Sequence, residues 1–365
     1  MATDRLDSCL AKLARLGGSD LHIKVGSPPR VRVDGALFVL EDEEPLTAEE
    51  TMAMAGSVMR PEMAEHFARH NEADLAYAVA GLGRFRVNVF RQRGSVAMVL
   101  RRVVQSAARF DELGLPPVVA KLSEEQRGLV LVSGPTGSGK TTTLAAMVDH
   151  INRSRSVNIV TIEDPIEVLH KDQLASICQR EIGFDTESFA SAMRAAMRQD
   201  PDVILVGEMR DIETVSAALS AAETGHLVLS TLHTIDATET VNRIVDFFPP
   251  YQQHQVRVAL AGALRGTLCQ RLVPRSDGMG RVVAMEAMVT NGRIQQCILD
   301  PSLTEGIREI IADGDYYGMQ TFDQSLFTLY ERGAIDMRQA MMAASNPHDL
   351  KVMLQKKGLA STAAN

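Results

Sequence analysis

The stretch Gly134-Pro135-Thr136-Gly137-Ser138-Gly139-Lys140-Thr141 decides the fold of this chain. It follows an apolar run from Leu129 to Ser133 and leads into a helical pattern from Thr141 to Ile151. Glycines in such a loop let the backbone bend so that its N–H groups converge on phosphate oxygens, and the following helix directs its positive end at the anion. This strand, loop and helix predict a P-loop that binds a nucleoside triphosphate.

The roles of the loop residues follow from their chemistry. Lys140 is expected to reach the β- and γ-phosphates, and the hydroxyl of Thr141 is expected to take a Mg²⁺ position. The expected cofactors are therefore ATP and Mg²⁺. The predicted nucleotide contacts are Gly134, Pro135, Thr136, Gly137, Ser138, Gly139, Lys140, Thr141 and Thr142.

Two acidic segments follow short apolar stretches of the chain. Glu163 lies in Thr161–Glu167, at the end of a strand that we expect beside the P-loop strand. Glu208 follows Val203–Val206 in the layout of a Walker B strand, with Gly207 where Asp is common. A P-loop enzyme needs carboxylates for Mg²⁺ and for the attacking water. We expect Glu208 to contact Mg²⁺, but the sequence leaves open which of the two glutamates is the catalytic base.

Two histidines, His226 and His233, flank the apolar stretch Leu227 to Leu232. They are candidates for sensing the γ-phosphate or for bridging to a neighbouring subunit, although a single histidine at such a position is more often structural. Because they lie at opposite ends of one expected strand, they are not expected to share a metal ion.

The region from residue 117 onward alternates short apolar stretches with helical patterns. This alternation predicts an α/β domain with a parallel sheet, of the RecA-like P-loop class. Residues 237 to 355 are mostly helical in pattern. The apolar stretches expected as strands are Leu129 to Ser133, Asn158 to Ile162, Val203 to Val206, and Leu227 to Leu232.

The region before it predicts a smaller α+β domain over residues 1 to 103. A helix with leucines at helical spacing is expected to end at Gly17-Gly18, and residues 47 to 70 read as helical. A hairpin turn is expected at Asp34-Gly35. Residues 104 to 116 are expected to be a linker to a domain of residues 117 to 365. The expected strands are 19–25, 31–33, 74–80, 84–90 and 96–103.

Arginines concentrate between Arg84 and Arg102, a stretch that contains no acidic residue. Arg84 and Arg86 share one face of the expected strand because side chains alternate along it. Three interpretations compete: a solvated strand face, a nucleic-acid groove, and arginines that reach a nucleotide phosphate. The third is favoured because the guanidinium group is planar, always charged and able to bind phosphate through two nitrogens.

The composition narrows the class of protein. The net charge of −8 and the 4% aromatic content argue against a non-specific nucleic-acid binder. The four cysteines form no C-x-x-C pair, so they read as free thiols in a reducing cytosol. The N-terminus lacks an apolar signal region, and no stretch approaches the roughly 18 apolar residues of a membrane span. We expect a soluble protein that meets membranes only through a partner or a surface.

Taken together, these segments resemble the secretion ATPase superfamily of type II secretion and type IV pili, and most of all its pilus retraction ATPases. The resemblance extends in order over nearly the whole chain. It rests on residues 17–22 (GGSDLH), 84–88 (RFRVN), 134–141, 163–167 (EDPIE), 206–211 (VGEMRD), 224–234 and 318–323 (GMQTFD).

The resemblance implies a PAS-like N-terminal domain, a RecA-like C-terminal domain and a homohexamer. Each nucleotide would lie between the two domains, with Arg86 and Arg101 closing over it. The ring would be cytoplasmic and peripheral at the inner membrane. There it would dock on the platform protein of the pilus, with a paralogous retraction ATPase as a further possible partner, and no nucleic acid is expected.

The direction of movement is less clear than the class of motor. The N-terminal extension and tetracysteine motif of extension-type relatives have no counterpart in this sequence, which favours retraction. Asn291–Leu299, however, departs from the helix that retraction enzymes carry there, and Cys269–Pro274 looks more like the extension and secretion branch. A pilus-extension or type II secretion motor, a nucleic-acid translocase and a nucleotide-binding scaffold remain alternatives.

Overall fold

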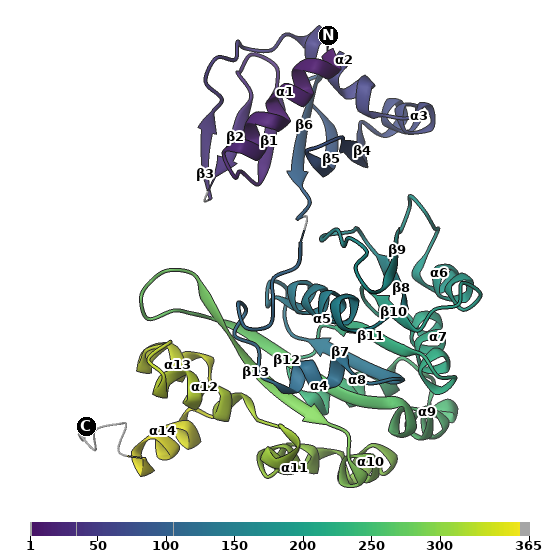
Figure 1. The fold of residues 1–365 in the computed structure, drawn as a ribbon, viewed down its shortest axis with the longest axis vertical. Coiled ribbons are helices and arrows are strands. Elements are labelled where there is room, and N and C mark those ends of the chain that lie inside the picture. Colours follow the sequence, from purple (N-terminus) through teal and green to yellow (C-terminus); the bar gives the residue numbers. More distant parts are fainter. Residues whose placement is uncertain (1, 34, 105, 358–365) are drawn as a thin grey trace. The chain divides into compact units, whose positions relative to one another are not determined.

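The computed structural model describes residues 2–33, 35–104 and 106–357 of the 365-residue chain. The chain divides into two compact units, each with its own sheet (Figure 1). The N-terminal unit contains the described residues up to Val104 together with Glu167–Leu169. The C-terminal unit contains the described residues from Ser106 to Ile166 and from His170 onward.

The N-terminal unit contains an antiparallel sheet in the order β3-β2-β1-β6-β5-β4. All five expected strand stretches are confirmed to within a few residues, and β3 pairs with β2 as the expected hairpin requires. Asp34, half of the expected hairpin turn, lies outside the described residues. The strands are β1 Asp20–Lys24, β2 Arg30–Val33, β3 Ala36–Val39, β4 Glu72–Val79, β5 Gly83–Gln92 and β6 Ser95–Arg102.

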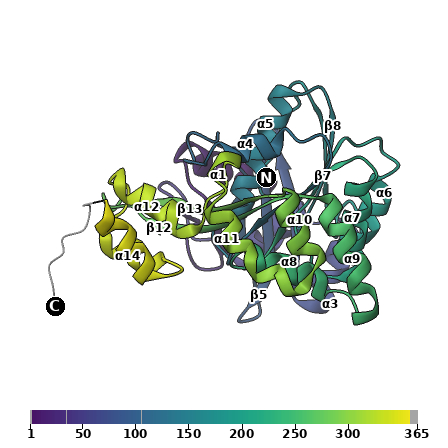
Figure 2. The ribbon, with the colours of Figure 1, turned by 90° about the horizontal axis from the view of Figure 1, so that it is seen from below.

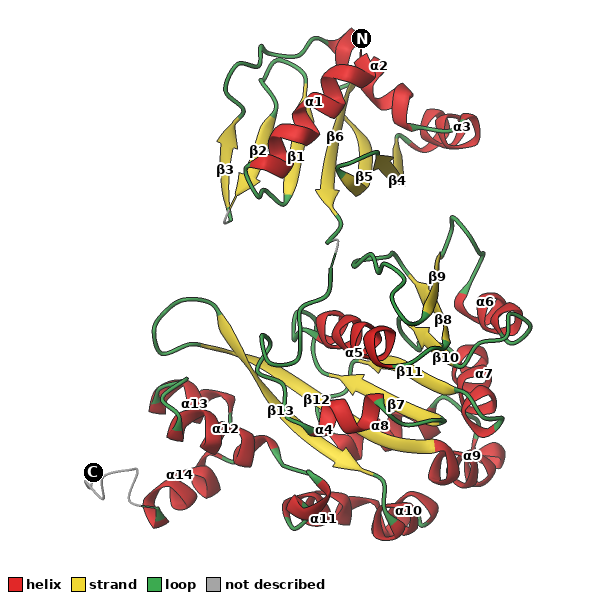
Figure 3. Cartoon of the chain, in the orientation of Figure 1, coloured by secondary structure: helices red, strands yellow, loops and turns green. Residues whose placement is uncertain are grey.

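Three helices cover one face of this sheet (Figure 3). They are α1 Ala2–Arg15, α2 Ala48–Val58 and α3 Pro61–His70. The helical pattern expected over residues 47–70 is confirmed as two helices, because the chain turns at Arg60. Its backbone is extended there, as the residue before a proline prefers, and Pro61 then starts α3 at a position where its missing N–H costs nothing.

The C-terminal unit contains the larger sheet, in the order β13-β12-β7-β11-β10-β8-β9. Its strands pair in parallel except β13, which is antiparallel to β12. The expected α/β domain with a parallel sheet is confirmed. The strands are β7 Gly128–Ser133, β8 Asn158–Glu163, β9 Ser176–Glu181, β10 Val203–Val206, β11 Leu227–Leu232, β12 Leu264–Pro274 and β13 Arg281–Val289.

One expectation for this unit is wrong. The strand that ends at Glu163 does not lie beside the P-loop strand, because β11 and β10 separate β8 from β7. The region from residue 237 to 355 is mostly helical, as expected, but β12 and β13 also form a long hairpin within it. The turn signal Asp277-Gly278 between the two strands was available in the sequence.

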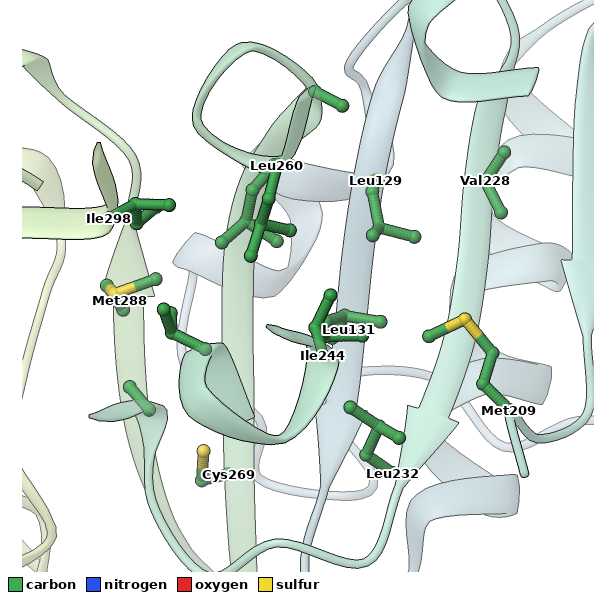
Figure 4. Packing of buried hydrophobic residues seen from close by; sticks show 14 of the residues in the cluster. Leu129, Leu131, Met209, Val228, Leu232, Ile244, Leu260, Cys269, Met288 and Ile298 are labelled. Carbon is green, nitrogen blue, oxygen red and sulfur yellow. The ribbon is translucent and has the colours of Figure 1, made fainter. Parts of the chain in front are cut away.

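Helices pack on both faces of the central sheet, as Figure 2 shows from below. Alternate residues of β7 face opposite layers: Val130 and Val132 contact the α4 and α5 side, and Leu129 and Leu131 contact the other side. Figure 4 shows the second layer, where Leu131 lies close to Ile244 of α8. Burial on both faces explains why these strands are continuously apolar.

The remaining elements surround this sheet. Among the helices in the part of the chain that the structure describes, none is both long and apolar enough to cross a membrane. The helices are α4 Val118–Ser123, α5 Lys140–Ser154, α6 Phe189–Ala196, α7 Ile212–Glu223, α8 Ala237–Asp246, α9 Pro250–Ala263, α10 Gly292–Leu299, α11 Ile307–Ala312, α12 Phe322–Glu331, α13 Met337–Ala343 and α14 Pro347–Lys356, with 3-10 turns at Pro301–Gly306 and Asp315–Tyr317.

Candidate nucleotide site

The loop between β7 and α5 has the backbone that the sequence predicts. Gly137 and Gly139 have φ angles of 79° and 91°, in the left-handed region that favours glycine. Gly134 is crowded as well, because a Cβ there would collide with the carbonyl oxygen of Gln270. Gly139 is the N-cap of α5 and has no side chain to cap the first turn. The amides of that turn are therefore suited to binding an anion.

Lys140 lies folded over this loop. Its Nζ donates to the carbonyl oxygens of Gly134, at 2.8 Å, and of Pro135, at 3.1 Å. Burial lowers the pKa of Lys140, and the charge of Glu208 opposes that shift. Lys140 follows β7 and Glu208 follows β10, so both lie at the carboxyl edge of the parallel sheet. Thr141 and Thr142 are exposed on the first turn of α5, where a metal or phosphate can reach them.

Glu208 follows β10 and is largely buried. Its side chain is 14% exposed, and its Oε2 lies 2.7 Å from Arg210 Nε and 3.7 Å from His233 Nε2. The peptide before it is fixed, because Gly207 donates its N–H to Ile162 and accepts from the Thr231 hydroxyl. A carboxylate so placed can hold a divalent cation or orient a water molecule.

The glycine at position 207 has a packing reason. A Cβ there would lie 3.3 Å from the carbonyl oxygen of Ile162 and 3.5 Å from the Cα of Glu163. An aspartate, common at this point of a Walker B strand, would push β10 away from β8. The close approach brings the ends of these two strands together.

Glu163 is the last residue of β8 and is oriented by two side chains. Its Oε1 accepts hydrogen bonds from the Thr161 hydroxyl, at 2.6 Å, and from Gln179 Nε2, at 3.1 Å. Since Val206 pairs with Ile162, the ends of β10 and β8 are level and Glu163 lies close to Gly207. The structure therefore gathers both candidate carboxylates at the carboxyl edge of the sheet, which is where ligands of parallel sheets bind.

The two histidines lie at opposite ends of β11. His233 follows β11 at the same edge as Glu208, but His226 precedes β11, and its carbonyl accepts from the N–H of Gly128, the first residue of β7. A strand of this length spans about 20 Å at roughly 3.3 Å per residue. The structure therefore does not bring His226 to the P-loop of its own chain.

The two candidate arginines belong to the N-terminal unit. Arg86 and Arg101 are direct partners across β5 and β6. They lie on the sheet face opposite the buried Phe85 and Val87. Arg101 is 65% exposed, and its Nε donates to Asp20 at 2.7 Å. Burial opposes ionisation of that carboxyl, but hydrogen bonds from Ser19 and Arg101 outweigh it and hold the Asp20 pKa below its usual range.

Gln270 is a site residue that the sequence did not reveal. It is fully buried on β12, and its Nε2 donates to the carbonyl of Ser138 inside the P-loop at 3.0 Å. Its carbonyl oxygen also faces Gly134. Its Oε1 and the hydroxyl of Ser138 are buried without a hydrogen-bond partner among the described residues. The residue is over a hundred positions from the loop in the chain, so only the pairing of β12 with β7 brings it there.

Known proteins resemble this chain over nearly its whole length. Residues 6–314 match the family described as Type II/IV secretion system protein. The chain is 42% identical to the type IV pilus retraction ATPase PilT of Pseudomonas aeruginosa over 93% of its own length and 98% of that protein. It is 40% identical to the type IV pilus ATPase PilU of the same organism, over 94% of its own length and 91% of that protein.

A solved structure agrees with these sequence matches. The crystal structure of the pilus retraction motor PilT with bound ADP superposes with a TM-score of 0.87 and 45% identity. The match covers 96% of this chain and 99% of that one. The similarity therefore includes the elements that carry the P-loop, both glutamates and both arginines.

Proposed function

Because the chain belongs to the Type II/IV secretion system protein family and is an ATPase of its pilus retraction type, we propose that it hydrolyses ATP to power retraction of type IV pili. Twitching motility would be the cellular result. The observation that carries the proposal is the gathering of Lys140, Glu208 and Glu163 at one edge of the C-terminal sheet. The ADP in a structure so similar to this one supports a nucleotide at that edge.

The site suggests a division of labour between the two carboxylates. Glu208 couples electrostatically to Lys140 and, with the hydroxyl of Thr141, would hold Mg²⁺. Hydrogen bonds from Thr161 and Gln179 orient the carboxylate of Glu163, which would position the attacking water. Lys140 and the loop amides would hold the β- and γ-phosphates. His233, within 4 Å of Glu208, would respond to the γ-phosphate.

The arginines would complete the catalytic group. Arg86 and Arg101 form an adjacent cationic pair on the N-terminal sheet. They would stabilise the charge that develops on the γ-phosphate, as arginine fingers do. We place them over ATP in a homohexamer, and His226 would act there, if at all, at a neighbouring subunit.

The partners follow from the proposed motor. The ring would be cytoplasmic, dock peripherally at the inner membrane on the platform protein of the pilus, and work there with a paralogous retraction ATPase. Movement between the two units during the ATP cycle would transmit force to that partner.

The experiment that tests this function is deletion of the gene in its host, with piliation and twitching scored together. Retraction predicts more surface pili and loss of movement, and both defects should be restored by the wild-type gene but not by a Lys140→Ala copy. Loss of pili would instead indicate an extension motor. Normal piliation and movement with a secretion defect would indicate a type II secretion motor, and ATPase activity stimulated by DNA would indicate a translocase.

A further inference from the structure

A chain of buried hydroxyl groups joins the start of the P-loop to the segment that carries His233. At its centre is Thr240, which is fully buried on the second turn of α8. Its Oγ1 lies 2.7 Å from the Thr234 hydroxyl and 3.3 Å from the Ser133 hydroxyl. Thr240 also donates to the carbonyl oxygen of Asp236 at 2.7 Å. One side chain thus contacts both the last residue of β7 and the segment between His233 and α8.

The two hydroxyl partners have informative places in the sequence. Ser133 is the last residue of β7 and comes directly before Gly134 of the P-loop. Thr234 comes directly after His233, which faces Glu208. Both partners are buried, with exposures of 0% and 3%. Thr240 therefore adds a side-chain link between the phosphate loop and the histidine that we assign to the γ-phosphate, beside the backbone pairing of Ser133 with Leu232.

The donor and acceptor roles within this group of hydroxyls follow from the single proton that each one carries. Thr240 has one hydroxyl proton, and because it donates that proton to Asp236, its oxygen accepts from Thr234. Ser133 also has one hydroxyl proton, which lies within reach of two acceptors: Thr240 Oγ1, at 3.3 Å, and Cys269 Sγ on the neighbouring strand β12, at 3.1 Å. In Figure 4, Cys269 lies on the face of the sheet that α8 covers, where Ile244 of that helix packs. A displacement at either end would break a bond that water cannot replace.

Further hydrogen bonds fix the segment between His233 and α8. Asp236 caps α8 by accepting from the N–H of Glu239, and Glu239 accepts from the N–H of Ile235. The N–H of Ala237 donates to the buried carboxyl of Glu286 on β13. These bonds hold the turn to β13, and Thr240 joins the same turn to β7.

From this arrangement we propose that Thr240 is a positioning residue for ATP hydrolysis, which holds His233 in a fixed place relative to the P-loop. The inference rests on the proposed function, because it requires His233 to act in the reaction. Thr240 does not touch nucleotide. It acts by setting where the His233 ring lies with respect to Glu208, and small displacements of such groups are costly to the rate.

The test compares Thr240→Val with Thr240→Ser in the full-length protein. Valine keeps the shape and removes the hydroxyl, so kcat for ATP should fall about tenfold while KM and ADP affinity stay within about twofold. Serine keeps the hydroxyl and should restore kcat. If Thr240→Val fails to fold, Thr234→Val removes the other end of the same hydrogen bond and carries the same expectation.

The decisive readout is the double variant with His233→Ala. If Thr240 acts through His233, adding Thr240→Val to His233→Ala should lower kcat no further. Equal losses in both backgrounds would overturn the inference, and so would a normal kcat for Thr240→Val. A normal kcat for His233→Ala alone would instead remove the role of His233 from the proposed function.

The matched control is Thr304→Val. Thr304 is also buried, and its hydroxyl donates to the carbonyl of Cys297 near α10. Loss of that bond should lower the melting temperature about as much as Thr240→Val does, with kcat unchanged. A similar fall of kcat in the control would mean that general destabilisation explains the effect.

Discussion

The two sheets of this molecule present their functional side chains in different ways. The N-terminal sheet is antiparallel and covered by helices on one face, so its alternate residues leave a polar face where Arg86 and Arg101 stand side by side. The C-terminal sheet is mostly parallel and covered on both faces, so its functional residues appear only beyond the ends of its strands.

The two sheets also differ in how many of the candidate site residues each one brings together. At the carboxyl edge of the parallel sheet, one chain already brings a phosphate loop, two carboxylates and a histidine together. On the antiparallel sheet, Arg86 and Arg101 stand side by side, and Arg101 donates to Asp20. We therefore propose that the C-terminal unit binds nucleotide and that the N-terminal unit supplies the positive charge that speeds hydrolysis. The predictions below test each half of that comparison.

The largest expected effect is at the carboxylates of the C-terminal unit. Glu208→Gln and Glu163→Gln should each lower kcat by about 100-fold or more, because each removes a charge needed for Mg²⁺ or for the water. Only Glu208→Gln should raise the Mg²⁺ concentration that gives half-maximal rate. Steady-state turnover against Mg²⁺ measures both quantities. Glu213→Gln, a surface glutamate of α7, is the control, and identical Mg²⁺ curves for the two variants would refute the division of labour.

Arg86→Ala tests the other half of the comparison. Turnover should fall about 100-fold while ATP affinity changes by about threefold or less, since the guanidinium acts on charge that develops in the transition state. Fluorescent nucleotide titration and turnover separate the two effects. Arg69→Ala, on α3 of the same unit, should change neither. A loss of affinity equal to the loss of turnover would make Arg86 an ordinary binding residue.

Gln270→Leu should have an intermediate effect confined to the C-terminal unit. It removes the donor to Ser138 and leaves a buried carbonyl unpaired, so the loop should lose its shape and nucleotide affinity should fall about tenfold. Isothermal titration with ADP measures this. Gln320→Leu removes a comparable bond to the carbonyl of Met285 and should leave ADP affinity intact. Unchanged affinity in Gln270→Leu would leave Gln270 with a packing role only.

The smallest expected effect is on stability. Burial raises the pKa of Glu286 to about 7 from its usual 4.5. The folded protein therefore holds this proton more tightly than the unfolded chain, so unfolding free energy falls as pH rises from 4.5 to 7 and is level above. At pH 8 the buried charge of Glu286 lowers the unfolding free energy by about 3 kcal/mol at most. Glu286→Gln should remove it.

Thermal melts of Glu286→Gln and the parent chain at pH 5 and pH 8 test this prediction. The stability advantage of the variant should be larger at pH 8. Glu309→Gln, an exposed glutamate on α11, should give no such difference. An advantage of equal size at both pH values would mean that the carboxyl of Glu286 does not titrate in this range.

The sequence predicted the local parts of this molecule well. The P-loop could be recognised because its glycines, lysine and threonine are contiguous and their spacing reflects the backbone they must adopt. Glu208 could be placed because an apolar strand leads directly into it. The break between α2 and α3 was not predicted, although Pro61 was the signal for it.

The parts that depend on strand order could not be predicted in the same way. Periodicity identifies a strand but not its neighbours, which is why β8 was expected beside β7 when two strands lie between them. Gln270 contacts the P-loop only because β12 pairs with β7, so no local pattern reveals it. Thr240 reads as an ordinary helical residue until Ser133 and Thr234 are seen beside it.

The central claim is that ATP is hydrolysed at the loop between β7 and α5. The most direct test is the steady-state ATP turnover of purified Lys140→Ala, with circular dichroism and sedimentation to show that fold and assembly match the wild type. The account predicts that turnover falls by about a thousandfold or more, because the phosphates lose their one loop cation. Near-normal hydrolysis by a correctly assembled Lys140→Ala protein would contradict it.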